Sequence, residues 1–158
     1  MPFKLEGSCH CGKVKYSCDS NTPYPYQHCT CSICRKVGGF MGSVNIMGLT
    51  STLTIEGEEY LKSYTPKGNG IAGPIASKRF FCGECGSMLW LHDDTWKEWV
   101  YPFASSIDVT LPTPPEILVV LRASCPKYVP IPEGAETEEA YREESIEDWH
   151  KKRGLWID

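Results

Sequence analysis

Seven of the nine cysteines fall into three tight groups, and this clustering is the strongest sign of chemistry in the sequence. Cysteines two or three residues apart can bind one metal ion from a single turn, and zinc normally takes four ligands in a tetrahedron. In a reducing compartment, clustered cysteines are more often metal ligands than disulfides. The groups are a CxC pair at Cys9 and Cys11, a CxCxxC triplet at Cys29, Cys31 and Cys34, and a CxxC pair at Cys82 and Cys85.

The seven clustered cysteines divide most naturally into a set of four and a set of three. A closed structural zinc site uses four protein ligands, whereas a catalytic site uses three and leaves the fourth position open. The two pairs together would supply a structural site, and the triplet would supply a catalytic site. We therefore expect two zinc ions per chain, one structural and one catalytic. Spacing alone also permits a conventional zinc ribbon, in which Cys31 and Cys34 share one ion with Cys82 and Cys85.

Short β-strands must position these cysteines. Residues 3–18 alternate between apolar and polar side chains, which predicts a hairpin bent at the first pair. Residues 28–40 predict a knuckle around the triplet, with a helical turn that ends at Gly38-Gly39. Residues 67–77 have the composition of a flexible loop. Further short strands are expected at residues 42–47, 51–58, 59–66, 78–82, 98–109 and 116–123.

The C-terminal segment differs in character from the rest of the chain. Residues 137–153 are highly charged, with acids early and bases late, an order that suits the helix dipole and predicts a solvent-exposed helix. A chain of 158 residues is typical of one domain. We therefore expect a mainly β protein. Its zinc-stapled domain would span residues 1–132 with antiparallel sheets, and a helical tail at residues 133–158 would pack on that domain.

Composition and charge exclude several classes of protein. The formal net charge is −4, and seven ionised thiols with two zinc ions would lower it to about −7, which disfavours general binding to nucleic acid. No stretch approaches the roughly 18 apolar residues that a membrane helix needs. The N-terminal segment lacks the apolar core of a signal peptide. We therefore expect a cytosolic protein, with the nucleus as a second location, that binds neither nucleic acid nor membrane.

Three segments around the cysteines resemble the signature segments of the glutathione-dependent formaldehyde-activating enzyme (GFA) family, whose domain vertebrate centromere protein V shares. They read GSCHCGKVKY, HCTCSICRKVGG and FFCGECGSMLW, and they occur in order within residues 3–125. The resemblance implies a β-tent fold, a mostly antiparallel β structure that carries zinc. It also implies the division that ligand counting favours, with Cys9, Cys11, Cys82 and Cys85 on the structural zinc and Cys29, Cys31 and Cys34 on the catalytic zinc.

A zinc ion held by three thiolates has a net negative charge, so it is a weaker Lewis acid than one held by neutral imidazoles. Such a centre is suited to exchanging its fourth ligand for a soft thiolate. The resemblance implies that this ligand is the thiol of glutathione or a related thiol, kept deprotonated below its free pKa of about 8.5. The sulfur could add to a small aldehyde such as formaldehyde. The reverse reaction would be that of a carbon–sulfur lyase.

Cationic side chains near the cysteines are candidates for binding the carboxylates of glutathione. Arg35 follows the triplet and Arg79 precedes the CxxC pair. Arginine can form two parallel hydrogen bonds with a carboxylate, so we predict that both residues bind substrate. His28 precedes the triplet and could be a fourth ligand, an acid–base group or a packed side chain.

Several other residues favour structural roles. Cys18 is expected to be a half-buried small hydrophobic side chain, and Cys125 a similar one close to the expected pocket. Phe40 is expected to pack in the core, and Asp93-Asp94 to form an acidic turn.

The main alternative to an enzyme is a non-catalytic binding or chaperone module on the same fold, because a fold does not fix a function. One site with four cysteines would suffice for such a module, so the additional triplet favours the enzyme. Association with chromatin, suggested by the centromeric relative, is disfavoured because the chain is acidic and has no basic stretch.

Overall fold

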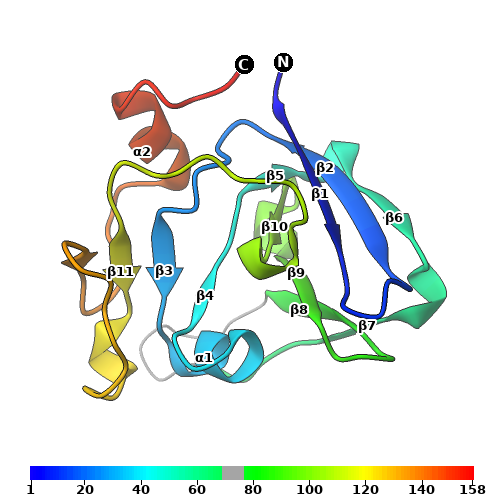
Figure 1. Ribbon diagram of the computed structural model, residues 1–158, viewed down its shortest axis with the longest axis horizontal. Helices are drawn as coiled ribbons and strands as arrows, with labels where there is room; N and C mark the ends of the chain where they lie inside the picture. Colours follow the sequence, from blue (N-terminus) through cyan, green and yellow to red (C-terminus); the bar gives the residue numbers. More distant parts are fainter. Residues whose placement is uncertain (69–76) are drawn as a thin grey trace.

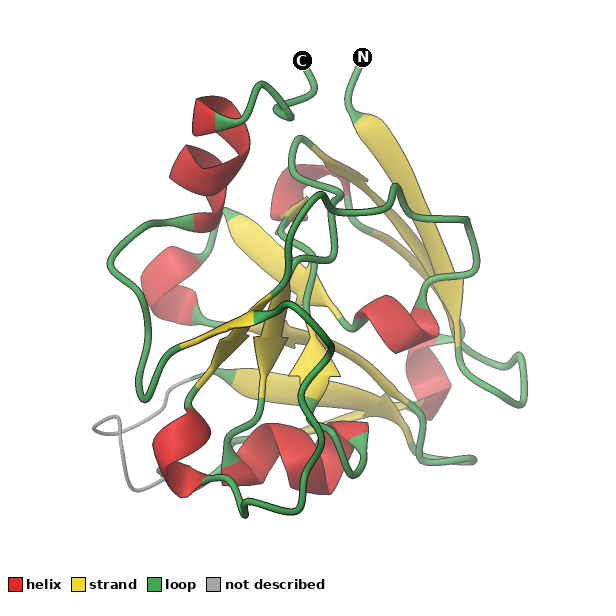
Figure 2. Cartoon of the chain, turned by 60° about the vertical axis from the view of Figure 1, so that its left-hand side comes forward, coloured by secondary structure: helices red, strands yellow, loops and turns green. Residues whose placement is uncertain are grey.

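The computed structural model describes residues 1–68 and 77–158, and within them the chain forms three β-sheets and two α-helices (Figure 1). This confirms a mainly β protein with a C-terminal helix. Most of the loop expected at residues 67–77 lies outside the described residues. No helix in the described part of the chain has both the length and the apolar character needed to cross a bilayer. The two ends of the chain lie close together, as Figures 1 and 2 both show.

The first sheet confirms the predicted N-terminal hairpin. Its first two strands pair antiparallel, with Leu5 opposite Cys18 and Gly7 opposite Tyr16. A Cβ atom at Gly7 would lie 2.4 Å from the Tyr16 ring, so only glycine fits beneath this ring. The strands, in spatial order, are β1 (Phe3–Ser8), β2 (Lys15–Ser20) and β6 (Thr54–Glu56).

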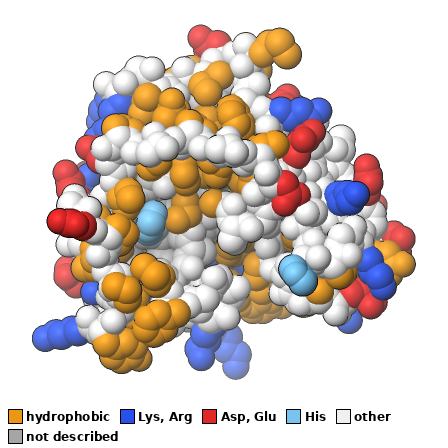
Figure 3. All heavy atoms as spheres, viewed as in Figure 1, with side chains coloured by type: hydrophobic (Ala, Val, Ile, Leu, Met, Phe, Trp, Pro, Cys, Tyr) orange, Lys and Arg blue, Asp and Glu red, His pale blue; other side chains and the backbone are white. Residues whose placement is uncertain are grey.

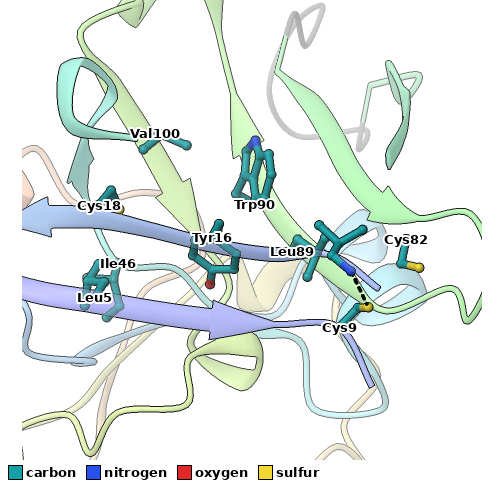
Figure 4. Close-up of a cluster of buried hydrophobic side chains, with 10 residues drawn as sticks. Leu5, Cys9, Tyr16, Cys18, Ile46, Cys82, Leu89, Trp90 and Val100 are labelled. Atoms are coloured by element: carbon teal, nitrogen blue, oxygen red, sulfur yellow. Dashed lines mark hydrogen bonds between the residues drawn. The ribbon is translucent and has the colours of Figure 1, made fainter. Parts of the chain in front are cut away.

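The second sheet is antiparallel throughout and shares a hydrophobic core with the first sheet (Figure 4). The Trp90 ring meets the Tyr16 ring edge-on, with 5.2 Å between centroids. Cys18 belongs to this core and is 1% exposed, so it is a small hydrophobic side chain, more deeply buried than expected. The strands, in spatial order, are β5 (Gly48–Leu49), β10 (Trp99–Pro102), β9 (Met88–His92), β8 (Lys78–Cys82) and β7 (Leu61–Tyr64).

The third sheet carries the triplet, and it includes parallel pairs beside the antiparallel ones. β11 runs parallel to β3 and to β12, whereas β3 and β4 are antiparallel. The strands, in spatial order, are β12 (Glu136–Thr137), β11 (Leu118–Val120), β3 (Gln27–Cys29) and β4 (Ser43–Val44). Helix α1 (Ser32–Gly38) follows β3 and ends at Gly39, where φ is 115°, which confirms the predicted helical turn.

Short 3-10 helices complete the connections between strands in the described residues. They are Thr50–Thr52, Glu58–Tyr60, Asp94–Trp96, Ala104–Ser106 and Arg122–Ser124.

The C-terminal helix is shorter than predicted. Helix α2 spans only Ile146–Lys152 and begins after Ser145, whose hydroxyl accepts a hydrogen bond from the backbone N–H of Asp148 at 3.0 Å. The residues before it extend along β11 instead, where the backbone N–H of Glu138 donates to the carbonyl of Val119 at 2.9 Å. Because these backbone groups already pair with a strand, they cannot also close helical turns. The predicted helix over residues 137–153 was therefore wrong in its first half.

Helix α2 exposes Asp148, Lys151 and Lys152 to solvent, as the charged sequence predicted, but its opposite face is buried. Trp149 is 1% exposed and stacks on Tyr26, with 3.8 Å between ring centroids. Leu118 and Leu121 belong to the same hydrophobic cluster. Figures 1 and 2 show α1 and α2 at opposite ends of the third sheet. The tail thus packs on the strands that carry the triplet, although the domain boundary at residue 132 stays a prediction.

Candidate metal centres and active site

Two turns bring the CxC and CxxC pairs together, and we call these four residues the quartet: Cys9, Cys11, Cys82 and Cys85. The first pair lies between β1 and β2, and the second begins at the last residue of β8 and continues into the turn before β9. All four sulfur atoms lie within 4.8 Å of one another, with 3.5 Å between Sγ of Cys9 and Cys11 and 3.8 Å between Sγ of Cys11 and Cys82. A tetrahedron with Zn–S distances of about 2.3 Å has edges of about 3.8 Å. The quartet therefore fits a tetrahedral zinc ion.

Backbone conformation holds both turns of the quartet in place. Gly12 and Gly86 directly follow the last cysteine of each pair, and their φ angles of 78° and 77° lie in the left-handed region that glycine adopts readily. The backbone N–H of Val14 donates to Sγ of Cys9 at 3.3 Å, as drawn in Figure 4. The two turns thus direct their sulfur atoms towards one another.

At Cys85, hydrogen bonds also favour the thiolate form that zinc requires. The Ser87 hydroxyl lies 3.2 Å from Sγ of Cys85, and this contact, followed by the backbone N–H of Cys11, lowers the pKa of Cys85 to about 5. Cys9 and Cys82 are buried, whereas Cys11 and Cys85 are exposed. Four cysteine ligands leave no open position, which suits a structural site.

The triplet forms a second group, the trio of Cys29, Cys31 and Cys34, where β3 leads into α1. Cys29 ends β3, Cys31 directly precedes α1, and Cys34 lies in the first turn of that helix. Their sulfur atoms lie within 4.8 Å of one another, and the backbone N–H of Cys34 donates to Sγ of Cys31 at 3.4 Å. Within residues 1–68 and 77–158, no further cysteine, histidine, aspartate or glutamate joins this group. The zinc ribbon considered above is not formed, because the CxxC pair lies with the CxC pair instead.

The three thiols of the trio strongly shift one another's pKa. Hydrogen bonds from the Cys29 and Cys34 thiols lower the pKa of Cys31 well below its usual value, whereas the hydrogen bond between Cys29 and Cys31 raises the pKa of Cys29. One thiolate is therefore favoured, whereas three adjacent thiolates would repel one another without a nearby cation. Soft thiolates select zinc among the common divalent cations, so the donor set fits this ion.

His28 does not join the trio. Successive residues of a strand point to opposite faces, and His28 lines a separate hollow with Met41 and Ser43. Burial lowers the pKa of His28, as expected of a packed imidazole. The structure therefore favours packing over ligation for this residue.

A cavity of about 320 Å³ lies beside the trio. This volume is at the lower end of the range for small-molecule sites. Cys29 and Cys34 form one side of the cavity. Another side comes from the second sheet, where Arg79, Leu91 and Tyr101 form a row across β8, β9 and β10 because Leu91 pairs with both other residues. The candidate active site thus lies between strands of two different sheets, and these strands are distant from each other in the sequence.

The C-terminal tail completes the cavity with Tyr141 and Ile146. The Tyr141 side chain is 58% exposed, but local desolvation and the nearby charge of the trio raise its pKa, so its phenol is a hydrogen-bond donor at neutral pH. The next residue, Arg142, pairs with Glu136 at 2.7 Å and with Glu138 at 2.8 Å. Sequence reasoning missed Tyr141, and the only available signal was one aromatic side chain inside a charged segment.

Arg79 lies where a substrate-binding cation was predicted, within the cavity. Its side chain is almost fully buried at 5% exposure, and Nη1 donates to the carbonyl of Ser77 at 2.8 Å. Its Nε has no hydrogen-bond partner among the described residues. A buried guanidinium is costly unless it is paired, so this arrangement suits an anionic ligand.

Arg35, the other predicted cation, does not line the cavity. Its Nε donates to the carbonyl of Thr30 at 3.0 Å, and its Nη2 donates to the carbonyl of Ser124 at 3.1 Å. These hydrogen bonds join the knuckle around the trio to the segment after β11. The role of Arg35 in binding substrate stays a prediction.

Asn45 and Asp93 also line the cavity, and sequence reasoning assigned neither of them a part in the site. Asn45 accepts a hydrogen bond from the Ser43 hydroxyl at 3.2 Å and donates to the carbonyl of Tyr101 at 3.3 Å. Asp93, expected to form a simple turn, is 9% exposed. No motif marks either position, because each reaches the cavity only through strand pairing.

Cys125 and Phe40 lie outside both groups of sulfur atoms. Cys125 is half-buried and accepts a hydrogen bond from Nη1 of Arg122 at 3.2 Å. Phe40 is 61% exposed and stacks on the exposed Tyr128, so the expectation that it packs in the core was wrong. Figure 3 shows hydrophobic side chains gathered at the lower left of the molecule, over the segment that follows β11.

Comparison with known proteins gives one consistent family. Residues 4–118 match the family described as "Glutathione-dependent formaldehyde-activating enzyme". A protein of Halomonas elongata named "Putative glutathione-dependent formaldehyde-activating enzyme" is 43% identical over 155 residues, which cover 96% of this chain and 97% of that protein. A crystal structure of a Rhodobacter sphaeroides protein is similar with a TM-score of 0.53 and 25% identity, over 68% of this chain and 91% of the other. The chain therefore belongs to the glutathione-dependent formaldehyde-activating enzyme family.

Proposed function

We propose that this protein adds the thiol of glutathione, or of a similar molecule, to formaldehyde or another small aldehyde, and also catalyses the reverse carbon–sulfur lyase reaction. The observation that carries the proposal is the placement of the trio, because Cys29 and Cys34 line a cavity of ligand size. The family and the printed name of the Halomonas relative support glutathione and formaldehyde as substrates. The quartet lies outside this cavity and is proposed to hold a structural zinc ion.

The proposed ligands of the catalytic zinc are the three sulfur atoms of the trio. When bound there, zinc would supply a soft Lewis acid whose fourth position keeps a substrate thiol deprotonated at neutral pH. The protein contributes the geometry, because β3 and the first turn of α1 fix all three donors. Burial of Cys31 and Cys34 excludes water from their sulfur atoms, which strengthens electrostatic interactions there.

Polar groups of the cavity would orient the reactants. Arg79 would bind a carboxylate of the thiol substrate, and the Tyr141 phenol would donate a hydrogen bond to the aldehyde oxygen. In the addition, the sulfur forms a bond to the carbonyl carbon and the π bond of the carbonyl opens. The oxygen then takes up a proton equivalent to the one that the thiol has lost. The reaction is a balanced addition and needs no oxidant or reductant.

Compartment and partners follow from the same proposal. All nine cysteines are free of disulfides, as expected in a reducing compartment, so we propose the cytosol, with the nucleus as a second location. The proposed partners are a small thiol and an aldehyde, without nucleic acid. Arg35 is retained as a second proposed carboxylate-binding residue.

Formation of the adduct can be measured directly with ¹³C-labelled formaldehyde and glutathione by NMR. We expect the zinc-loaded protein to accelerate formation of the S-hydroxymethyl signal above the uncatalysed rate, and to accelerate its loss when adduct is supplied alone. Metal analysis should find two zinc ions per chain, one of which a mild chelator removes together with the activity.

The same measurements distinguish the alternative. One inert zinc per chain and no acceleration in either direction would overturn the enzyme, and would support a non-catalytic module on the same fold.

A further inference from the structure

One end of the active-site cavity carries two buried groups of opposite charge, Arg79 and Asp93. Ser77 joins them. Its carbonyl accepts a hydrogen bond from Nη1 of Arg79 at 2.8 Å, and its hydroxyl donates to Oδ2 of Asp93 at 2.8 Å. Both charges therefore lie within hydrogen-bonding distance of the same residue. Strand pairing fixes this arrangement, since Ser77 precedes β8 and Asp93 follows the antiparallel β9.

Within residues 1–68 and 77–158, neither group has all of its hydrogen-bonding capacity used. Arg79 and Asp93 form no ion pair with each other, and Nε of Arg79 has no hydrogen-bond partner among the described residues. Among the described residues, Asp93 accepts hydrogen bonds from the Ser77 hydroxyl and from the backbone N–H and side chain of Thr95. A carboxylate offers about four acceptor positions, so these residues leave acceptor capacity for a ligand.

Asp93 is charged at neutral pH. Burial raises its pKa, but the hydrogen bonds from Thr95 and Ser77 outweigh that effect, so the pKa lies below its usual value. Arginine is always protonated. The cavity therefore presents one positive and one negative group beside each other, at a site that also contains the sulfur atoms of Cys29 and Cys34.

This pair of charges matches a ligand that carries both a carboxylate and an ammonium group. We propose that this end of the cavity binds the α-amino-acid head group of the substrate thiol, with Arg79 on its carboxylate and Asp93 on its ammonium. The inference rests on the proposed function, because the trio must bind the sulfur of the same molecule. It defines the substrate class as thiols that carry an α-amino-acid group, as glutathione does at its γ-glutamyl end.

The test compares two ligands whose only difference is the ammonium group. Calorimetry on the zinc-loaded protein gives the dissociation constants of glutathione and of an analogue in which hydrogen replaces the α-ammonium. A charge-assisted hydrogen bond in a buried site predicts that glutathione binds at least about tenfold more tightly. An analogue that lacks the γ-glutamyl α-carboxylate should be weakened to a similar degree through Arg79.

The protein variant for the same test is Asp93→Asn. Asparagine can still accept the hydrogen bond from the backbone N–H of Thr95, so the 3-10 helix at Asp94–Trp96 should keep its cap. The variant should lose most of the preference for glutathione over the des-amino analogue. The matched control is Asp94→Asn, because the adjacent Asp94 side chain is 94% exposed and should leave the preference intact.

Each outcome decides between the two proposals. Equal affinity of the wild-type protein for both thiols would overturn the amino-acid subsite while leaving the thiol-binding function in place. An unchanged preference in Asp93→Asn would also overturn the assignment of Asp93, and would leave it only the role of capping the helix. If neither thiol binds the wild-type protein, the proposed function and the subsite both fail.

Discussion

The quartet and the trio use the same ligand chemistry in two different surroundings. The quartet lies in two hairpin turns, with Cys11 and Cys85 exposed, and its four sulfur atoms leave no place for another ligand. The trio lies between a half-buried strand and a helix, has three sulfur atoms, and borders a cavity. The comparison indicates that the proposed structural and catalytic centres differ in the number of their ligands and in the adjoining space, and not in residue type.

The largest expected effect is on the quartet. Cys82→Ser should abolish cooperative folding, because a structural zinc ion contributes on the order of 10 kcal/mol in small domains, comparable to the total stability. Thermal unfolding followed by near-ultraviolet circular dichroism measures this effect. The control is Cys125→Ser, which lies outside both groups and should cost less than about 1 kcal/mol. A Cys82→Ser variant with wild-type unfolding would contradict a stabilising quartet.

The next effect separates the trio from the quartet. Cys34→Ser should lower the zinc content from about two ions to about one, and should reduce activity by more than about 100-fold. It should still unfold cooperatively, unlike Cys82→Ser, because the quartet still holds its ion. Metal analysis and the formaldehyde NMR assay measure the two quantities. Equal loss of stability in both variants would remove the distinction between the two centres.

A smaller effect tests Tyr141, which lines the cavity beside the trio. Tyr141→Phe removes the phenol from the cavity and should lower kcat by about tenfold, while the free energy of unfolding changes by less than about 0.5 kcal/mol. Tyr128→Phe is the matched control, because Tyr128 is 74% exposed and stacks on Phe40 outside the cavity. Similar kcat values for all three proteins would show that Tyr141 has no part in the reaction.

The smallest effect concerns pH and the tail beside the trio. His150 is fully buried, and burial lowers its pKa, so the folded protein keeps this imidazole neutral. The unfolded chain binds a proton below about pH 6.5. Stability from His150 is therefore fully present above that pH and is lost as the pH falls towards the lowered folded pKa.

NMR signals of the α2 amides should show this loss before those of the quartet turns, on lowering the pH from about 7.5 to about 5. His150→Phe cannot titrate and should flatten the pH dependence of α2. An unchanged pH dependence in that variant would assign the effect to other groups.

The two pairs and the triplet were predictable because their spacing is local, whereas the joining of the two pairs into the quartet was favoured by ligand counting and by the family resemblance. A CxC or CxxC pair needs only one turn to present both sulfur atoms, and the glycines that allow such turns stand in the sequence beside Cys11 and Cys85. The hairpin that carries the first pair was predictable for the same reason, since its alternation of apolar residues is continuous.

The cavity was not predictable, because its walls depend on contacts between distant segments. Asp93 reaches it through the pairing of β8 with β9, and Tyr141 through the backbone pairing of the tail with β11. The charge pattern of the tail indicated a solvated helix. It carried no information about the edge of β11, or about the Tyr26 ring that buries Trp149.

X-ray absorption at the zinc edge, with and without saturating glutathione, tests the central claim most directly. If the quartet is closed and the trio is open, the mean number of sulfur ligands per zinc should rise from about 3.5 to about 4 when glutathione is added. The same measurement on Cys34→Ser, which retains only the closed centre, should show no change. An unchanged sulfur count in the wild-type protein at saturating thiol would contradict an open centre at the trio.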